Sequence, residues 1–173
     1  MDIKSMLMTT SSIVNGYCIA SAPIDATFTS NSSEPTGTAW SIDGSKLFYV
    51  STWNPGDRVA EVNCPKPYTI ESASHTGNYY ATLSQGSYPQ SISFNATHTK
   101  MFISFTDTKI IAQYSLATPD VISTGVTYDG SFSTASQGNG EHHGLVFSPD
   151  GTKMMTTSTG GHDLFEYTLA TPF

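Results

Sequence analysis

The chain has few charged residues, few cysteines and no long hydrophobic run. Each of these shortages argues against one class of protein. Only 12% of its 173 residues are charged, about half the roughly 25% of an ordinary domain. The chain has seven Lys and Arg residues and 14 Asp and Glu residues, so its formal net charge is -7. We therefore expect no nucleic-acid partner, which would need a basic surface. Because no run approaches 18 apolar residues, we also expect no insertion into a membrane.

The two cysteines, Cys18 and Cys64, do not have the spacing of a metal-binding or redox motif. A disulfide framework is therefore not expected. We predict buried free thiols, with a bridge between the two as the alternative. Residues 1–12 contain no continuous apolar stretch, so the sequence predicts no signal peptide.

The residues that are abundant favour β-structure. Aromatic residues make up 12% of the chain, and Val, Ile, Phe, Tyr and Thr recur, all of which favour strands. No window of about 12 residues shows the 3.6-residue apolar period of a helix. The length is enough for one domain with a sizeable core, so we predict a single all-β domain.

One segment of the chain recurs at a constant spacing. The heptapeptide Phe-Ser-Pro-Asp-Gly-Thr-Lys at 147–153 has the pattern of two strands joined by a tight Asp-Gly turn. A related heptapeptide begins 53 residues earlier, at Phe94, and another begins at Trp40. The later motif Tyr-x-Leu-Ala-Thr-Pro at 167–172 also has a counterpart 53 residues earlier, at 114–119. Two separate motifs with one spacing indicate an internal repeat.

The repeat predicts units of four strands. First strands are expected at 37–42, 90–95 and 143–148, second strands at 3–9, 46–52, 99–105 and 152–158, third strands at 13–20, 57–63, 109–116 and 162–169, and fourth strands within 24–30, 68–83 and 121–133. Repeats of this length and content are typical of β-propeller blades, which bury two apolar faces against their neighbours. We predict one β-propeller-type domain over 1–173, with a partial blade at 1–34, blades at 35–87 and 88–140, and a partial blade at 141–173.

These motifs resemble the blade repeats of TolB-type and lactonase-type β-propellers, whose blades share a Phe-Ser-Pro-Asp-Gly-like turn. The Tyr-x-Leu-Ala-Thr-Pro tail is similar to repeats in structural proteins of marine bacteriophages and in secreted proteins of aquatic bacteria. The resemblance implies a propeller fold and a location in a virion, outside the cell or at a cell surface. It is poorly specific for activity, because propellers host many functions.

Two full and two partial blades do not make a closed ring, since propellers have four to eight blades. Three arrangements are open: a ring formed with copies of the same chain, a segment of a longer propeller, or an arc that docks on another virion or envelope protein. We favour assembly with other chains, because an arc with unpaired edges would aggregate.

Glu141, His142 and His143 form the densest cluster of groups that bind ligands. They lie just before and at the start of a predicted first strand, which in propellers borders the central channel. The His143-Gly144 step is similar to a channel-facing His-Gly step of gluconolactonase-like propellers. The other interpretation of this cluster is a polar loop whose histidine caps a neighbouring strand.

The resemblance to gluconolactonase-like enzymes also implies a metal held by carboxylates and Asn from several blades. The equivalent positions of the other units hold Pro89-Gln90 and Pro35-Thr36, which offer no carboxylate. Ligands for a metal would have to converge from several blades. We therefore expect no metal and no other cofactor, and we identify no catalytic residue.

Exposed aromatic side chains beside Asn are a common means of binding sugars, and Trp53 with Asn54 is the best candidate for a glycan contact. The alternative is that the aromatic residues outside the first three strands pack between blades. These residues are Trp53, Tyr79, Tyr80, Tyr88, Tyr128 and Phe132.

The leading hypothesis is a non-enzymatic propeller module that assembles with virion or cell-surface subunits and binds a host glycan. The alternative is a lactonase-like or hydrolase-like enzyme with its site at the central channel near His142 and His143. An enzyme would need groups that converge from at least three blades, whereas His142 and His143 come from one. A third hypothesis is a purely structural segment without a ligand.

Overall fold

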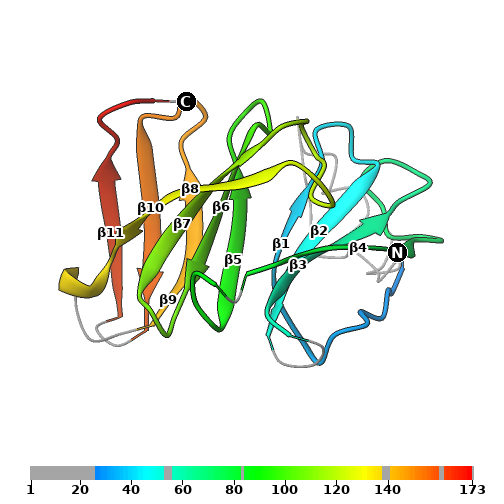
Figure 1. Ribbon diagram of the computed structural model, residues 1–173, viewed down its shortest axis with the longest axis horizontal. Helices are drawn as coiled ribbons and strands as arrows, with labels where there is room; N and C mark the ends of the chain where they lie inside the picture. Colours follow the sequence, from blue (N-terminus) through cyan, green and yellow to red (C-terminus); the bar gives the residue numbers. More distant parts are fainter. Residues whose placement is uncertain (1–25, 53–55, 83, 138–140, 160–161, 173) are drawn as a thin grey trace, which may run out of the picture.

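A computed structural model of the protein describes residues 26–52, 56–82, 84–137, 141–159 and 162–172. This part of the chain folds into antiparallel strands and one short 3-10 turn, η1 (Ala135–Gln137), so the expected all-β class is confirmed (Figure 1). The strands are β1 (Glu34–Trp40), β2 (Lys46–Thr52), β3 (Arg58–Asn63), β4 (Ser74–Ala81), β5 (Pro89–Phe94), β6 (Lys100–Phe105), β7 (Ile110–Leu116), β8 (Val126–Ser133), β9 (His142–Phe147), β10 (Lys153–Ser158) and β11 (Asp163–Thr168).

The strands form three sheets that stand side by side (Figure 1). We call them blade 1 (β1-β2-β3-β4), blade 2 (β5-β6-β7-β8) and blade 3 (β9-β10-β11). In each blade the strands follow the order of the chain and every neighbouring pair is antiparallel. Blades 1 and 2 have four strands, and blade 3 has three within the described residues.

The spacing of the repeat located most strands to within three residues. The predicted second and third strands of the three described units agree with the observed ones, and β4 and β8 lie inside the ranges expected for fourth strands. The fourth strand expected at 24–30 is not found over 26–30, which form no strand in the structure. The strands expected at 3–9 and 13–20 lie outside the described residues.

Turn chemistry fixes the corner between the first and second strands of blade 1. Asp43 Oδ1 accepts hydrogen bonds from the Ser41 hydroxyl at 2.8 Å and from the Ser45 amide at 2.9 Å. These donors hold the pKa of the Asp43 carboxyl down at about 2. Gly44 follows with a φ of 70°, a conformation that glycine adopts without strain. Asp150 is held in the same way in blade 3, with its pKa also lowered to about 2.

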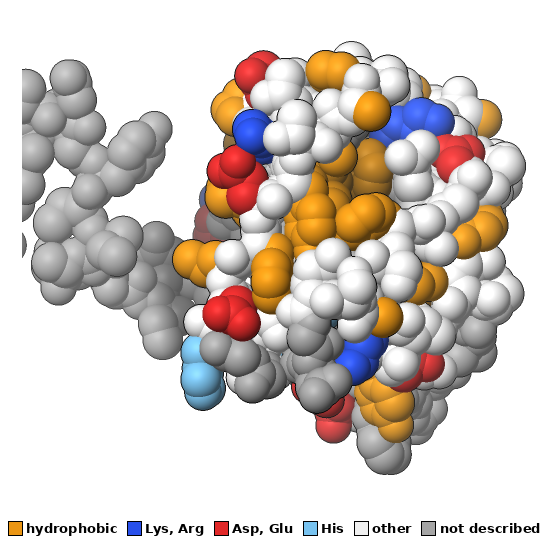
Figure 2. All heavy atoms as spheres, turned by 90° about the vertical axis from the view of Figure 1, so that its left-hand side faces the viewer, with side chains coloured by type: hydrophobic (Ala, Val, Ile, Leu, Met, Phe, Trp, Pro, Cys, Tyr) orange, Lys and Arg blue, Asp and Glu red, His pale blue; other side chains and the backbone are white. Residues whose placement is uncertain are grey.

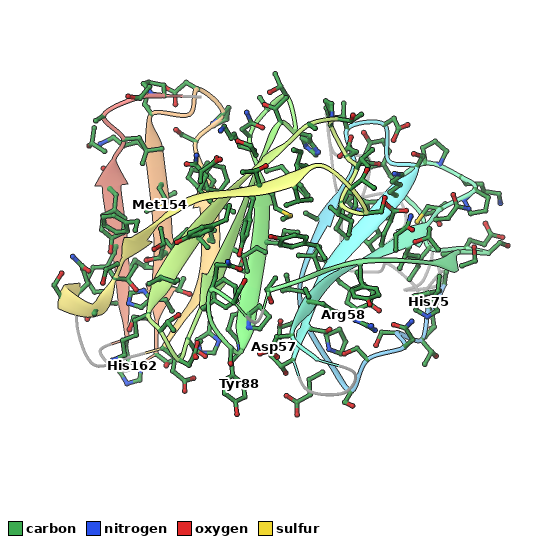
Figure 3. The ribbon with its side chains drawn as sticks, viewed as in Figure 1. Asp57, Arg58, His75, Tyr88, Met154 and His162 are labelled. Atoms are coloured by element: carbon green, nitrogen blue, oxygen red, sulfur yellow. The ribbon has the colours of Figure 1, made fainter. Side chains whose placement is uncertain are left out.

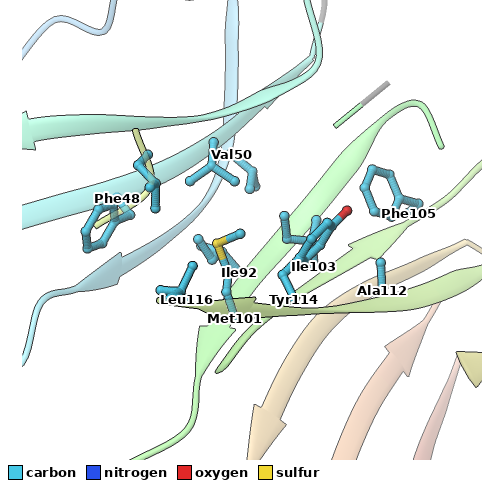
Figure 4. Close-up of a cluster of buried hydrophobic side chains, with 11 residues drawn as sticks. Phe48, Val50, Ile92, Met101, Ile103, Phe105, Ala112, Tyr114 and Leu116 are labelled. Atoms are coloured by element: carbon cyan, nitrogen blue, oxygen red, sulfur yellow. The ribbon is translucent and has the colours of Figure 1, made fainter. Parts of the chain in front are cut away.

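The main hydrophobic core lies between blades 1 and 2 (Figure 4). Side chains alternate along each strand, so Phe48 and Val50 of β2 face Met101 and Ile103 of β6. All four are fully buried. The remaining buried members are Val59, Ile92, Phe105, Ala112, Tyr114, Leu116 and Ile122. Burial of each blade face by the next blade is the physical basis of this repeat architecture.

Two smaller clusters lie on the other faces of these blades. Phe102 and Ile111 of blade 2 pack against Leu145 and Met154 of blade 3. On the side of blade 1 that faces away from blade 2, Tyr49, Ala60, Val62 and Cys64 form a cluster to which Phe28 adds its ring. Cys64 is a buried free thiol, as predicted, and burial raises its pKa. Cys18 lies outside the described residues.

The first strands of the blades, β1, β5 and β9, lie next to one another and form the inner edge of the arc. The approach of β1 to β5 is close at Gly37. A Cβ atom on Gly37 would lie 2.7 Å from both the Gln90 carbonyl oxygen and the Ser91 Cα atom. Glycine is therefore needed there for the two strands to come together.

Candidate functional site

The candidate site lies at the beginning of the three inner strands, where each strand is bulged. The pairing of β1 with β2 shifts between Pro35 and Thr38, and that of β5 with β6 shifts between Pro89 and Ser91. The pairing of β9 with β10 shifts opposite the segment between His142 and Leu145. Bulges leave a residue unpaired and redirect its side chain, and they are common beside active sites.

The bulged segments contain one polar residue from each blade, namely Thr36, Gln90 and His143. These residues occupy the repeat-equivalent positions that the sequence identified. Thr36 Oγ1 donates to the Pro89 carbonyl oxygen at 2.7 Å, which links blade 1 to blade 2. Gln90 and His143 are in contact across blades 2 and 3. The structure thus brings polar groups of three blades to one place.

His143 is the centre of this arrangement. Its Nδ1 lies 3.2 Å from Gln90 Oε1, and its Nε2 lies 3.2 Å from Glu141 Oε2. The side chain of His143 is 37% exposed and that of Glu141 is 64% exposed, so solvent and ligands reach both. We call this set the Glu141–His143–Gln90 chain. In such a series the groups on either side can hold the imidazole ring in one orientation, and the imidazole can transfer a proton.

His142 has a different environment from its neighbour. It is 1% exposed, its Nδ1 lies 3.3 Å from Thr156 Oγ1, and its ring packs near the ring of Phe165. Burial, together with the nearby Lys109 cation, lowers the pKa of His142. The structure therefore places His142 in the packing between blades 2 and 3, and only His143 and Glu141 are accessible.

Further polar residues lie at the same end of the molecule. Figure 3 shows Asp57, Tyr88 and His162 along its lower edge, on blades 1, 2 and 3 respectively. Asp57 is buried and its Oδ2 accepts the Tyr88 amide at 3.2 Å. The Asp107 carboxylate accepts the Ser87 amide at 2.9 Å in the next loop. These carboxylates hold the loops around the inner strands.

The donor set does not fit a metal ion. Within the described ranges, no three or more His, Cys, Asp or Glu side chains are grouped closely enough to hold one. Thr36 and Gln90 stand at the positions from which a multi-blade site would draw ligands. We therefore derive no step through a metal.

The predicted glycan contacts, Trp53 and Asn54, lie outside the described residues, so their role stays a prediction. The other aromatic residues singled out by the sequence include several that pack within the fold. Tyr80 meets Tyr114 edge to face at 5.4 Å, and Phe132 meets Tyr167 at 5.0 Å. Tyr79 lies under the Arg58 guanidinium at 5.5 Å. Tyr80 packs against the main core, whereas Tyr79 is 56% and Phe132 is 43% exposed, so a binding role for these two residues stays a prediction.

The sequence indicates that Thr36, Gln90 and His143 occupy equivalent positions of the repeat. It does not show that Gln90 and His143 are in contact. The constant spacing of the repeat was the available signal, because equivalent positions of neighbouring blades lie beside one another. The bulges that redirect these side chains have no comparable signature in the residues.

No helix in the described part of the chain is long and apolar enough to cross a membrane.

Comparison with known proteins gives the fold. Neither models of known protein families nor curated proteins match the chain. Among solved structures, the chain is similar to a putative 6-phosphogluconolactonase from Bacteroides uniformis, with 13% identity, a TM-score of 0.61 and coverage of 86% of this chain and 43% of the other. The periplasmic gluconolactonase of Pseudomonas aeruginosa has 15% identity, a TM-score of 0.56 and coverage of 78% and 37%.

A third similar structure is the β-propeller domain of Cps50 (Swd1) from Myceliophteria thermophila, with 10% identity, a TM-score of 0.50 and coverage of 78% of this chain and 37% of the other. The chain thus spans about two fifths of the length of these structures. The prediction of an all-β, propeller-type fold built of four-stranded antiparallel blades is confirmed. The likeness to lactonase-type propellers, expected from the turn motif, is confirmed at the level of the fold.

The expectation of a non-enzymatic protein is contradicted by these comparisons, because two of the three similar structures are lactonases by name. The expectation had rested on the lack of groups that converge from several blades, whereas the structure places His143 beside Gln90 of blade 2 and places Thr36 of blade 1 against the same strand β5. At 10–15% identity the likeness establishes the fold, and the activity is a matter for the proposal that follows. The fold of these blades is that of a β-propeller.

Proposed function

We propose that this chain belongs to a lactonase-like propeller hydrolase whose site lies at the beginning of the inner strands. The observation that carries the proposal is the Glu141–His143–Gln90 chain, which joins two blades at bulged positions. Thr36 of blade 1 lies at the equivalent position and contacts strand β5, which carries Gln90. The similarity to two lactonases supports this reaction class.

His143 is the proton-transfer group in this proposal. When Nδ1 acts as the base, Nε2–H donates a hydrogen bond to Glu141, which holds the ring in that tautomer. An unprotonated Nδ1 cannot bond to the Gln90 oxygen, because both atoms are acceptors, so this contact must open for catalysis. A water molecule takes the place of the Gln90 oxygen at Nδ1, and its proton passes to the ring as its oxygen attacks the lactone carbonyl carbon. The bond from that carbon to the ring oxygen of the lactone then breaks, and the leaving oxygen takes the proton back from His143.

Gln90 has a binding role. The Gln90 amide, once displaced from His143, donates to an oxygen of the substrate, and such donors stabilise charge that develops on a carbonyl oxygen. The substrate class is a small, polyhydroxylated lactone, because the surrounding groups are polar, uncharged or acidic. The virion setting that the resemblance to phage repeats implies, and the glycan contact expected at Trp53 and Asn54, stay predictions.

The proposal is tested by following hydrolysis of a gluconolactone with a pH indicator, with the spontaneous rate subtracted. We expect the chain to accelerate hydrolysis and His143→Asn to lower kcat/KM by about 100-fold or more. Glu141→Gln should lower it less, since the carboxylate only orients the ring. The matched control is His162→Asn, an exposed histidine of the next loop, which should leave the rate unchanged. Hydrolysis at the spontaneous rate, or equal loss in both histidine variants, would overturn the proposal.

A further inference from the structure

The outward face of blade 3 is built like a covered face but is open in the described structure. Met155 and Leu164 occupy the same register positions on β10 and β11 as Phe48 and Val59 on β2 and β3. Phe48 and Val59 are fully buried, whereas Met155 is 44% and Leu164 is 81% exposed. Val146 of β9, which pairs with Met155, is also half exposed. We call Val146, Met155 and Leu164 the open face.

The outer edge of blade 3 is incomplete as well. Strands β3 and β7 each pair with a fourth strand, but no described strand pairs with the outer edge of β11. A groove of about 690 Å³ lies beside this edge, between β8 and β11. Its apolar lining includes Phe132, Met154, Tyr167 and Leu169. Figure 2 views the molecule from the side on which β11 lies, and hydrophobic side chains gather at the centre of this view.

Blade 2 shows what fills this place in a complete blade. Ile122 and Val126, from the segment that follows β7 and begins β8, pack into the core between blades 1 and 2. Polar contacts also need the fourth strand, since Asn78 of β4 donates to Glu61 and Gln113 donates to Asp129 of β8. In blade 3 the equivalent pair is Lys153 and Glu166, joined at 2.8 Å, and no fourth strand adds to it within the described residues.

The opposite end of the molecule carries a segment in the position of a fourth strand. Phe28, Tyr80 and Phe132 are spaced by 52 residues. Tyr80 packs on Tyr114 of blade 2, Phe132 packs on Tyr167 of blade 3, and Phe28 packs in the cluster on the outward side of blade 1. Residues 26–30 therefore contact blade 1 in the same way that β4 contacts blade 2 and β8 contacts blade 3. No described strand pairs with residues 26–30.

We propose that the open face and the outer edge of β11 bind the outward side of blade 1 in a second copy of this chain. In this arrangement residues 26–30 of the second copy pair with β11 of the first copy and form the fourth strand of its blade 3. Phe28 of the second copy still packs on blade 1 of the second copy. The open face is then covered as Phe48 and Val59 are covered within one chain. Counted over the described blades alone, two copies joined head to tail at both ends place six blades in a ring, within the four to eight of known propellers.

The first test is the mass of the full chain in solution, measured by light scattering after size exclusion over a range of concentrations. We expect a particle of twice the 18.6 kDa mass of one chain. Leu164→Lys should raise the dissociation constant at least tenfold, because it places a charge on the covered face. The matched control is Ile42→Lys, since Ile42 is an exposed apolar residue, at 51% against 81% for Leu164. Its backbone amide donates to Asp120 of blade 2, away from this face. A monomer at all concentrations, or equal effects of both changes, would overturn the proposal.

The second test separates head-to-tail pairing from pairing of two identical faces. Phe28→Lys alters only the blade 1 side, so the proposal expects it to dissociate the particle as Leu164→Lys does. A Phe28→Lys chain that remains dimeric while Leu164→Lys is monomeric would show that two open faces pack on each other, which contradicts the proposal. Circular dichroism of each variant checks that the sheets are retained.

Discussion

One face of blade 1 and the equivalent face of blade 3 carry apolar residues at the same repeat positions, yet the first is core and the second is surface. Phe48 and Val59 of blade 1 lie under blade 2 and are excluded from water. Met155 and Leu164 of blade 3 are partly or largely exposed. Apolar character at a repeat position therefore does not by itself determine burial. Burial depends on whether another blade follows in space.

The largest expected effect comes from removing a side chain on the covered face. Phe48→Ala should lower the free energy of unfolding by about 3–5 kcal/mol, because it deletes a fully buried ring and leaves a cavity. Met155→Ala, at the same register position of blade 3, should change it by about 0.5 kcal/mol or less in the single chain, as is usual for surface positions. Urea unfolding of both variants at low protein concentration measures the difference.

A similar loss for Met155→Ala would mean that the open face is covered in solution even in a single chain. A loss that appears only when the protein concentration is raised would instead agree with the proposed pairing of two copies, since association stabilises the folded state by mass action.

The second effect concerns the glycines of the inner strands. Gly37→Ala should lower the free energy of unfolding by about 1–3 kcal/mol, because the new Cβ would meet backbone atoms of blade 2. Gly144→Ala should cost less, since its Cβ would meet the side chain of Thr157, which can move. Thermal unfolding compares the two variants. Equal losses would mean that β1 and β5 are not in close contact.

The smallest effect is the pH dependence of the corner turns, which compares blades 1 and 3 with blade 2. The carboxyls of Asp43 and Asp150 have their pKa lowered to about 2 by donated hydrogen bonds. Their folded pKa lies below the unfolded value of 3.8, so they stabilise the fold above pH 4. This contribution is lost as the pH falls from about 4 to about 2.

Replacement of both residues, Asp43→Asn with Asp150→Asn, should flatten the pH dependence of the unfolding temperature in that window. Blade 2 provides the comparison, because Thr97 stands at the equivalent position and Asn95 and Thr97 are uncharged. The His98–Asp120 contact at the same corner is unchanged in the double variant. NMR titration of the two carboxyls measures their pKa directly. Ordinary values near 3.8 would show that the turn hydrogen bonds are not formed in solution.

The fold could be predicted well from the sequence because its signals are local and repeated. The Asp-Gly corners at 43–44 and 150–151 and the spacing of 53 residues locate neighbouring strands without any long-range information. The fourth strands were placed less well, since β4 and β8 are mostly exposed and carry no regular apolar alternation. The strand expected at 24–30 was wrong for residues 26–30, because pairing depends on a partner strand and not on their own composition.

The candidate site could be predicted only in part. The sequence singled out Glu141, His142 and His143, and only the resemblance of the His143-Gly144 step to a channel-facing step set one histidine apart. Burial under Thr156 and Phe165 makes His142 a packing residue, while His143 reaches Gln90 on the neighbouring blade. The difference arises because a bulge changes which face each residue occupies, and a bulge depends on the pairing of two strands.

The period of the repeat, the corner turns and the order of strands within a blade follow from the residues alone, because hydrogen bonds and side-chain alternation over a few residues fix them. Only the tertiary structure decided which apolar positions are covered and which polar groups meet. Phe48 and Met155 share one position of the repeat. Thr36, Gln90 and His143 share another. Their different environments come from the blades beside them, and the contacts between blades join residues far apart in the chain.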